Sequence, residues 1–344
     1  MGERLASDLA LVADIGGTNT RFALTDIRKS GAVSLLSYRR YATADYPNLD
    51  AVLETYFADV GVKPGLGCLA LASIVLDDHI RITNCPWEFS VDHIRSQFGM
   101  DKLVSINDFA ALGWALPELD RQQMVAVNAG FGSLPSHRGD CAVLGPGTGL
   151  GVSAVRYLDG HPLVFPSEGG HVGFAPGNRL ETSVLQLLET RFGRVSQERL
   201  LCGTGLQNLH QALGVLRGHR PSDIDAREIT ELALSQQDSL CVETIEVFCG
   251  LLGSFAGDVA LMLGAWDGIY LGGGVVKALA DFLPTSQFND RFTDKGRFAD
   301  TLASIPCLAI TQRDAGLVGS AMALRHSIAV GAERAECLGV RFAS

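Results

Sequence analysis

The sequence has few charged and few aromatic residues, and its charge balance is acidic. Charged residues make up 19% and aromatic residues 7% of the 344 positions, and the formal net charge at pH 7 is −10. A balance of this sign opposes the broad basic surface with which proteins bind nucleic acid or anionic membranes. We therefore expect neither nucleic acid nor a membrane among the partners.

The cysteines lack the spacing of a metal or redox motif. No two of the eight form a C-x-x-C pair, and most of them stand in apolar runs. Scattered cysteines of this kind predict reduced thiols in a protein core rather than a disulfide framework or a zinc motif. They occupy positions 68, 85, 141, 202, 241, 249, 307 and 337.

Signals for export and for membrane insertion are also missing. Residues 1–8 carry acidic side chains where a secretory signal needs a basic segment and an apolar run. The longest apolar region, residues 240–265, contains Glu243, Glu246 and Asp258. Acidic residues at these positions predict a core helix or helix pair and not a membrane span. We expect a soluble, cytoplasmic protein.

The chain is long and rich in hydrophobic residues. Hydrophobic residues make up 47% of the 344 positions, which supports a large folded core and argues against disorder. A chain of this length exceeds one typical core, so it predicts two lobes with a binding site in the cleft between them.

A glycine turn lies between two strand-like segments near the N-terminus. Residues 14–21 read DIGGTNTR. Adjacent glycines permit positive φ angles and let backbone N–H groups approach a ligand without interference from a Cβ atom. The turn can therefore cradle phosphate oxygens, and Asp14 at the strand end is placed to hold a hydrated Mg²⁺. An ordinary hairpin is an equally good explanation, because Gly-Gly and Asn are common in hairpin turns.

A second stretch repeats this order of strand, glycine turn and strand. Residues 145–152 read GPGTGLGV. Two similar hairpins, each opening one half of the chain, predict an internal duplication with a ligand held between the halves. A dinucleotide-binding motif must open a helix, whereas residues 152–157 read as a strand. A P-loop is excluded because the sequence contains no Gly-Lys-Ser or Gly-Lys-Thr.

Two polar residues follow an apolar strand-like run at residues 104–106. Asn107 and Asp108 come next, and helical periodicity begins at Asp108. We interpret Asp108 as a catalytic base. The alternative is structural, because Asp is a favoured N-cap that accepts hydrogen bonds from the amides of the first helical turn.

An acid and an imidazole are separated by two glycines in residues 168–171, which read EGGH. A carboxylate can accept hydrogen bonds from two sugar hydroxyls, and the His171 imidazole can donate or accept beside it. A capped glycine turn is the structural alternative. Zinc binding through His171 is disfavoured, because no second His or Cys lies at ligand spacing. Glu198, in the pair Glu198-Arg199, has by itself only the features of a solvated or capping residue.

A third glycine turn, GGG at residues 272–274, joins a strand to a helix start. Such a turn suits close backbone contact with a flat base or a ribose. It is the last of six stretches that, taken together, resemble a known protein family. They are DIGGTNTR at 14–21, INDF at 106–109, GPGTGLGV at 145–152, EGGH at 168–171, ER at 198–199 and GGG at 272–274.

Together these stretches resemble the bacterial glucokinase family, the ATP-dependent glucose kinases of the hexokinase and actin-like ATPase superfamily. The resemblance implies a two-lobed α/β fold of the actin-like ATPase (RNase H-like) type, with an internally duplicated βββαβα core and a cleft between the lobes. It implies a small α/β domain of residues 1–118, completed by a C-terminal helix at about 315–340, and a large α/β domain of residues 119–314.

The resemblance also assigns roles to residues. It implies that Asp108 is the catalytic base. The implied glucose ligands are Asn107, Asp108, Glu168, His171 and Glu198. The implied ATP-binding residues are Ala13, Asp14, Ile15, Gly16, Gly17, Thr18, Gly147, Thr148 and, near the adenosine, Gly273. Asp14 would hold Mg²⁺ through water.

The implied reaction transfers the γ-phosphoryl group of ATP to the 6-hydroxyl of glucose, giving glucose 6-phosphate and ADP at the entry of glycolysis. A homodimer is typical of the family. The chain departs from it at Ala72, Ser73 and Ile74, where the family has a proline-containing segment. A kinase for another hexose or amino sugar, or a sugar or nucleotide sensor on the same fold, remains the alternative.

Overall fold

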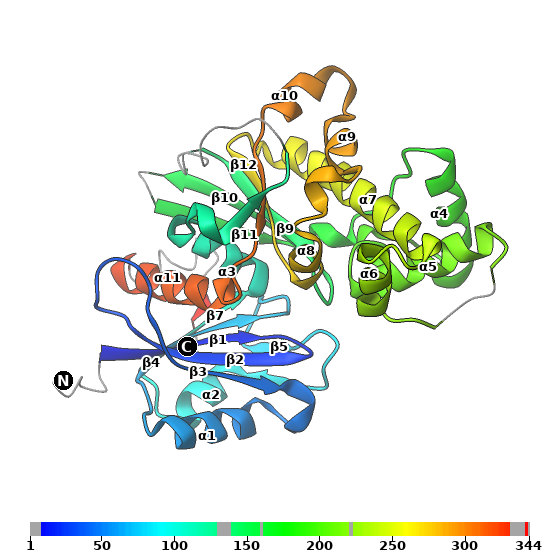
Figure 1. The fold of residues 1–344 in the computed structure, drawn as a ribbon. Coiled ribbons are helices and arrows are strands. Elements are labelled where there is room, and N and C mark those ends of the chain that lie inside the picture. The colour runs from blue at the N-terminus through cyan, green and yellow to red at the C-terminus, as the bar shows by residue number, and fades with distance from the viewer. Residues whose placement is uncertain (1–7, 129–138, 159–160, 220–222, 331–340, 343–344) are drawn as a thin grey trace. The chain divides into compact units, whose positions relative to one another are not determined.

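Two six-stranded sheets with related strand orders organise the chain (Figure 1). The structure is a computed structural model, and it describes residues 8–128, 139–158, 161–219, 223–330 and 341–342. Cys337 and the last ten residues of the C-terminal helix expected at 315–340 lie outside these described residues. The chain divides into a first unit, Met1–Leu119 with Tyr157–Pro166 and Gln312–Ser344, and a second unit, Asp120–Arg156 with Ser167–Thr311.

The sheet of the first unit has the strand order β14-β7-β4-β1-β2-β3. β1, β2 and β3 form an antiparallel meander, whereas β4 and β7 add to β1 in parallel. Parallel neighbours need crossover connections, and α1 and α2 provide them. The strands are β1 (Leu9–Ile15), β2 (Asn19–Asp26), β3 (Leu35–Ala42), β4 (Leu66–Leu71), β7 (Lys102–Asn107) and β14 (Arg341–Phe342), with the separate hairpin β5 (His79–Arg81) and β6 (Glu88–Ser90).

The helices of the first unit begin and end at residues with recognisable chemistry. In α1 the Asn48 side chain accepts a hydrogen bond from Ala51 N, and Gly61 ends the helix at a φ of 67°. These caps satisfy backbone groups that a helix end leaves unpaired. The helices are α1 (Leu49–Val60), α2 (Val91–Gln97), α3 (Asp108–Ala115) and α11 (Ala315–Val330).

The second sheet has the order β11-β10-β9-β12-β13-β8. Its strands belong to the second unit, except that Tyr157–Pro166, with the end of β10 and most of β11, is assigned to the first. β9 and β10 are antiparallel, and β12 and β13 continue from β9 in parallel. Read from β3, the first sheet runs β3-β2-β1-β4-β7, and the second runs β11-β10-β9-β12-β13 in the same arrangement. The predicted duplication and α/β fold class are therefore confirmed. The strands are β8 (Met124–Ala126), β9 (Cys141–Pro146), β10 (Leu150–Leu158), β11 (His161–Ser167), β12 (Gly268–Leu271) and β13 (Cys307–Ile310).

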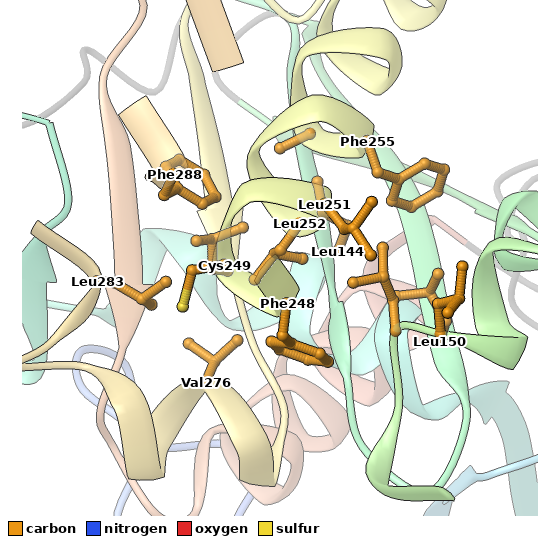
Figure 2. Packing of buried hydrophobic residues seen from close by; sticks show 14 of the residues in the cluster. Leu144, Leu150, Phe248, Cys249, Leu251, Leu252, Phe255, Val276, Leu283 and Phe288 are labelled. Carbon is orange, nitrogen blue, oxygen red and sulfur yellow. The ribbon is translucent and has the colours of Figure 1, made fainter. Parts of the chain in front are cut away.

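Helix α7 runs through the core of the second unit. It is one continuous helix, Ser239–Leu263, and 72% of its most apolar 18-residue stretch is buried inside the protein. Its length and composition would also suit a membrane span, but the burial identifies the predicted core helix. Figure 2 shows Leu251 and Phe255 of α7 beside Leu144 and Leu150, which belong to β9 and β10. The core therefore anchors the strands on both sides of the second glycine turn.

The remaining helices are shorter or peripheral. Those of the second unit are α4 (Arg179–Phe192), α5 (Gly203–Leu216), α6 (Ala226–Leu234), α8 (Gly274–Leu279), α9 (Phe288–Thr293) and α10 (Ala299–Ala303). The 3₁₀ helices of both units are η2 (Thr43–Asp45), η3 (Leu116–Glu118), η4 (Arg121–Gln123), η5 (Gly169–His171), η6 (Gln197–Arg199), η7 (Leu283–Thr285) and η8 (Gly296–Phe298).

Candidate active site

Asn107 and Asp108 stand where β7 ends and α3 begins. The Asn107 Oδ1 accepts hydrogen bonds from Phe109 N at 2.9 Å and from Ala110 N at 3.1 Å. Asn107 is therefore the N-cap of α3, and Asp108 is the first helical residue. The alternative that Asp108 is the N-cap is wrong, because the neighbouring amide already fills that role.

The other side of the Asn107 amide is held by a residue without an obvious sequence signal. Asn107 Nδ2 donates to the Ser73 carbonyl at 3.2 Å, and Ser73 Oγ donates to the Arg81 carbonyl at 2.7 Å. Thr83 N donates to the Ala72 carbonyl at 3.0 Å. The segment that departs from the family pattern thus holds the residue next to Asp108, through backbone carbonyls that do not require proline.

The first hairpin consists of β1, β2 and the turn at residues 16–18. Its turn is closed by Gly16 N, which donates to Asn19 O at 3.0 Å, and it is tied down by Thr43, whose Oγ1 donates to Gly16 O at 2.9 Å. Neither Gly16 nor Gly17 has a positive φ, so this turn does not use the positive φ angles that glycine permits. Glycine at 17 has a steric reason, since a Cβ atom there would lie 2.6 Å from the Thr83 carbonyl oxygen.

The predicted phosphate residues of this hairpin differ in access. Ala13 and Ile15 are fully buried, whereas Thr18 is exposed and Gly16 and Gly17 are partly exposed. The residues of the turn and the partly exposed Asp14 can therefore offer their atoms to a ligand, whereas Ala13 and Ile15 cannot. Ala13 instead accepts a hydrogen bond from Ser320 Oγ of α11 through its carbonyl, at 3.2 Å.

Asp14 forms an ion pair across the first hairpin. Arg21 Nη1 donates to Asp14 Oδ2 at 2.5 Å, and the two residues are register partners in β1 and β2. Burial works to lower the pKa of Arg21, but the attraction of Asp14 outweighs it and the pKa lies above its usual value. One carboxylate oxygen is engaged by Arg21, so the donor set suits a water-mediated cation contact better than direct ligation by both oxygens.

The second hairpin consists of β9, β10 and the turn at residues 147–149. Gly147 N donates to Gly149 O at 2.8 Å, and Gly203 N at the start of α5 donates to Gly147 O at 3.1 Å. Val152 to Leu158 belong to β10, which confirms that this glycine sequence does not open a helix. Thr148 is exposed, and its neighbours Gly147 and Gly149 are partly exposed.

The third turn, residues 272–274, packs directly on the second hairpin. Gly273 has a φ of 94°, and a Cβ atom there would lie 2.2 Å from the Pro146 carbonyl oxygen. A Cβ atom on Gly145 would lie 2.0 Å from the Gly272 carbonyl oxygen. The two turns therefore touch backbone to backbone, which only glycine permits.

Glu198, in η6, supports the second hairpin from outside. Its Oε2 accepts a hydrogen bond from Leu150 N at 2.8 Å. A Cβ atom on Gly149 would lie 2.5 Å from the same oxygen, so glycine is needed there for the carboxylate to approach. The other oxygen, Oε1, lies 4.0 Å from His171 Nε2.

Glu168 and His171 complete a cluster with Glu198 within the second unit. His171 Nε2 lies 3.9 Å from Glu168 Oε2, and both side chains are about half exposed, at 56% and 49%. Partial burial raises the pKa of Glu168, His171 opposes that shift and Glu198 adds to it. Arg194 fixes the backbone here by donating to the His171 carbonyl at 2.7 Å.

The structure thus brings together three of the five predicted glucose ligands, Glu168, His171 and Glu198. The other two, Asn107 and Asp108, are adjacent in the first unit. Sequence reasoning did not identify Thr43 and Ser73, because each acts through contacts with residues distant in the chain. The contact between α5 and Gly147 has a local sequence feature, because the Gly-Thr-Gly sequence at 203–205 begins α5 where Gly203 N donates to Gly147 O.

Comparisons with known proteins agree with this geometry. A family profile described as Glucokinase matches residues 11–327. A glucokinase from Stenotrophomonas maltophilia is 41% identical over 318 residues, which are 92% of this chain and 95% of that one. A glucokinase structure from an Antarctic psychrotroph matches with a TM-score of 0.80 at 34% identity, covering 93% of this chain and 99% of that one.

A more distant match supports the fold alone. The structure of a glucokinase from Balamuthia mandrillaris, in complex with glucose, has a TM-score of 0.77 at 19% identity. The aligned part covers 93% of this chain and 94% of that chain. The arrangement of strands and helices thus persists where most of the sequence has changed.

Proposed function

The chain belongs to the glucokinase family and phosphorylates glucose with ATP, and from this premise we propose which of its residues perform the reaction. The observation that carries the proposal is the placement of Glu198. Its two carboxylate oxygens face different partners, Leu150 N of the second hairpin at 2.8 Å and His171 at 4.0 Å. The Glu198 side chain thus lies between His171, which we propose contacts the sugar, and the turn that we propose holds phosphate.

Asp108 is the catalytic base in this proposal. It accepts the proton of the glucose 6-hydroxyl while that oxygen attacks the γ-phosphorus of ATP. Asn107 is the N-cap of α3, and Asp108 shares only the Phe109 N–H with it, through Oδ1 at 2.9 Å. Phosphoryl transfer depends on positioning and on charge stabilisation, and a base adds a rate factor of about 10² to 10⁴.

Asn107, Glu168, His171 and Glu198 bind the sugar hydroxyls. Carboxylates accept hydrogen bonds from hydroxyl groups, whereas the Asn107 amide and the His171 imidazole can donate as well as accept. A sugar that lacks one of these hydroxyls leaves a polar group without its partner. That loss is the physical basis of discrimination between glucose and its analogues.

The turns of the two hairpins hold the phosphates of ATP, and Gly273 lies near the adenosine. Gly16, Gly17 and Thr18 contribute from the first hairpin, and Gly147 and Thr148 from the second. A bound Mg²⁺ would supply charge neutralisation for the phosphates. Asp14 would hold it through water, since Arg21 already engages one of its oxygens.

We also propose that the protein is a cytoplasmic homodimer. Its proposed domains are residues 1–118, completed by the C-terminal helix to about 340, and residues 119–314. Light scattering coupled to size-exclusion chromatography tests the dimer. A mass of about twice the 36.6 kDa chain supports it, and a single-chain mass contradicts it.

Asp108→Asn tests the assignment of the base. The substitution keeps the shape of the side chain but removes its proton-accepting charge, so we expect kcat to fall about 10²- to 10⁴-fold while glucose still binds. Glucose 6-phosphate formation across a small hexose panel measures the activity, and calorimetry measures glucose binding. A kcat within tenfold of wild type, with intact binding, means that another group takes the proton.

A further inference from the structure

Three side chains with different metal-binding atoms meet where α5 lies beside the start of α7. His210 of α5 offers an imidazole nitrogen, Asp238 a carboxylate oxygen and Cys241 a thiol sulfur, and these atoms all lie within 4.8 Å of one another. The arrangement was not visible as a spacing in the sequence, because residues 211–237 separate His210 from the other two. None of the three belongs to the candidate active site.

One ring nitrogen of His210 has no hydrogen-bond partner in the described part of the chain. The residue is 3% exposed, and its buried Nδ1 has no hydrogen-bond partner among the described residues. Leaving a buried polar atom unpaired is unfavourable, so native proteins usually satisfy such atoms. A cation held by the neighbouring side chains would satisfy it.

Asp238 joins the buried part of the cluster to solvent. Its Oδ1 accepts a hydrogen bond from Cys241 N at 2.7 Å and thereby caps α7. The capping bond uses one carboxylate oxygen, and the residue itself is exposed. A cation can therefore enter from this side and retain a water molecule as a further ligand.

Cys241 is a buried free thiol. Burial raises its pKa to about 12, and the neighbouring Asp238 acts in the same direction, so the free thiol is protonated at neutral pH. A bound cation would replace this proton and stabilise the thiolate, and the proton would be released to solvent. The charge of the bound cation would then be balanced by the thiolate and the carboxylate.

We propose that His210, Asp238 and Cys241 form a binding site for a borderline divalent cation, with Zn²⁺ as the best match. Nitrogen, oxygen and sulfur ligands together suit Zn²⁺, whereas Mg²⁺ and Ca²⁺ select oxygen ligands. Water would complete a tetrahedral set. The cation would tie α5 to α7, and α5 in turn holds the second hairpin through Gly203 N.

Metal binding is measured on the full chain after treatment with a chelator. We expect one equivalent of Zn²⁺ by calorimetry. With Co²⁺ as a spectroscopic probe, we expect the charge-transfer absorption of a thiolate ligand. Cys241→Ser should remove that absorption and weaken Zn²⁺ binding more than about 100-fold, since even changes outside the ligand set cost 10- to 100-fold.

The chain offers matched controls for both exposed and buried positions. Cys249→Ser changes another buried cysteine of α7 and should leave the Co²⁺ spectrum intact. Asp238→Asn keeps a good N-cap and hence the fold, but removes a charged ligand, so it should weaken binding. Asp225→Asn is its control, because Asp225 caps α6 in the same way.

Two results would overturn the proposal. One is wild-type protein that binds no Zn²⁺ or shows no thiolate absorption with Co²⁺. The other is equal loss of binding in Asp238→Asn and Asp225→Asn, which would trace the effect to helix capping. Because every readout is metal binding and not glucose phosphorylation, these outcomes are independent of the proposed catalytic roles.

Discussion

The two glycine hairpins share their topology but are held in place by different means. The first carries its own carboxylate, Asp14, which is fixed by Arg21 on the adjacent strand. The second has glycine and proline at residues 145 and 146, and the nearby carboxylate comes from Glu198, in another element. The carboxylate beside the first turn is therefore fixed within its own hairpin, whereas the one beside the second turn comes from another element of the second unit.

Both turns are also held through their backbone by other elements. Gly16 O accepts a hydrogen bond from the Thr43 side chain, whereas Gly147 O accepts one from the backbone of α5. The first turn packs on Thr83 at Gly17, and the second packs on the third turn through Gly145 and Gly273. The two hairpins thus differ mainly in the source of the carboxylate beside the turn.

The largest expected effect comes from Glu198. In Glu198→Ala both the bond to Leu150 N and the contact with the sugar site are lost, each worth about 1.5 to 3 kcal/mol for a charged group. We expect kcat/KM to fall about 10²- to 10⁴-fold, with higher KM values for both glucose and ATP. Steady-state kinetics with each substrate varied in turn measures the two separately.

Glu198→Gln is the matched variant. Its amide oxygen can still accept the hydrogen bond from Leu150 N, so the KM for ATP should stay near that of wild type while the KM for glucose rises. If Glu198→Ala changes only the KM for glucose, the carboxylate does not support the hairpin.

A smaller but still large effect is expected on stability from Gly145. In Gly145→Ala the new Cβ atom would lie 2.0 Å from the Gly272 carbonyl oxygen, so the backbone must shift, at a cost of about 3 kcal/mol. In Gly147→Ala the nearest atom, Gly149 O, is 4.0 Å away, and we expect little change in stability. Thermal unfolding midpoints compare the two variants, and equal midpoints would show that the two turns are not packed together as described.

The ion pair of the first hairpin has a more modest role. Arg21→Met leaves the partly buried Asp14 carboxylate without its partner, and we expect a loss of about 1 kcal/mol in the free energy of unfolding. Arg156→Met is the control, because Arg156 pairs with Asp140 on the more exposed end of the second hairpin. Denaturant unfolding should show no change for this control, and a larger effect there than for Arg21 would reverse the comparison.

The smallest expected effect is a pH dependence from Glu168. Its pKa is raised by burial, so on acidification it takes up a proton at a higher pH than an ordinary glutamate. The charged form, which we propose binds glucose, is then depleted, and kcat/KM for glucose should fall as the pH falls toward this pKa, by less than about tenfold under mildly acidic conditions. Glu168→Gln should lower activity but remove this part of the pH profile; an unchanged profile assigns it to another group.

The repeating strands and the polar residues at strand ends could be predicted from the sequence. Apolar runs ending in Asn107, Asp108 or a glycine turn are local patterns, and the structure has strands and turns at those places. The reasons for individual residues were harder to predict. Gly17 is explained by the distant Thr83 carbonyl and not by its own φ angle, and Asn107 is the cap that could equally have been Asp108.

Contacts between residues far apart in the chain were the part that local reasoning could not reach. Thr43 and Ser73 act through hydrogen bonds to other segments, and such bonds leave no periodic pattern. His210, Asp238 and Cys241 do not form a metal-binding sequence motif, because such motifs have short spacings between their ligands. Helix packing brings them together instead.

The backbone contact between the second hairpin and the third turn has a practical consequence for engineering phosphoryl-donor preference. Libraries that vary Gly145 or Gly273 would mostly yield misfolded variants, since any side chain there meets a carbonyl oxygen. Gly274 is exposed, and among the described residues no atom outside its own helix and its chain neighbours lies within 4 Å of where its Cβ would stand. Diversity introduced at that neighbouring position can change the surface of the proposed nucleotide site while the scaffold beneath it stays fixed.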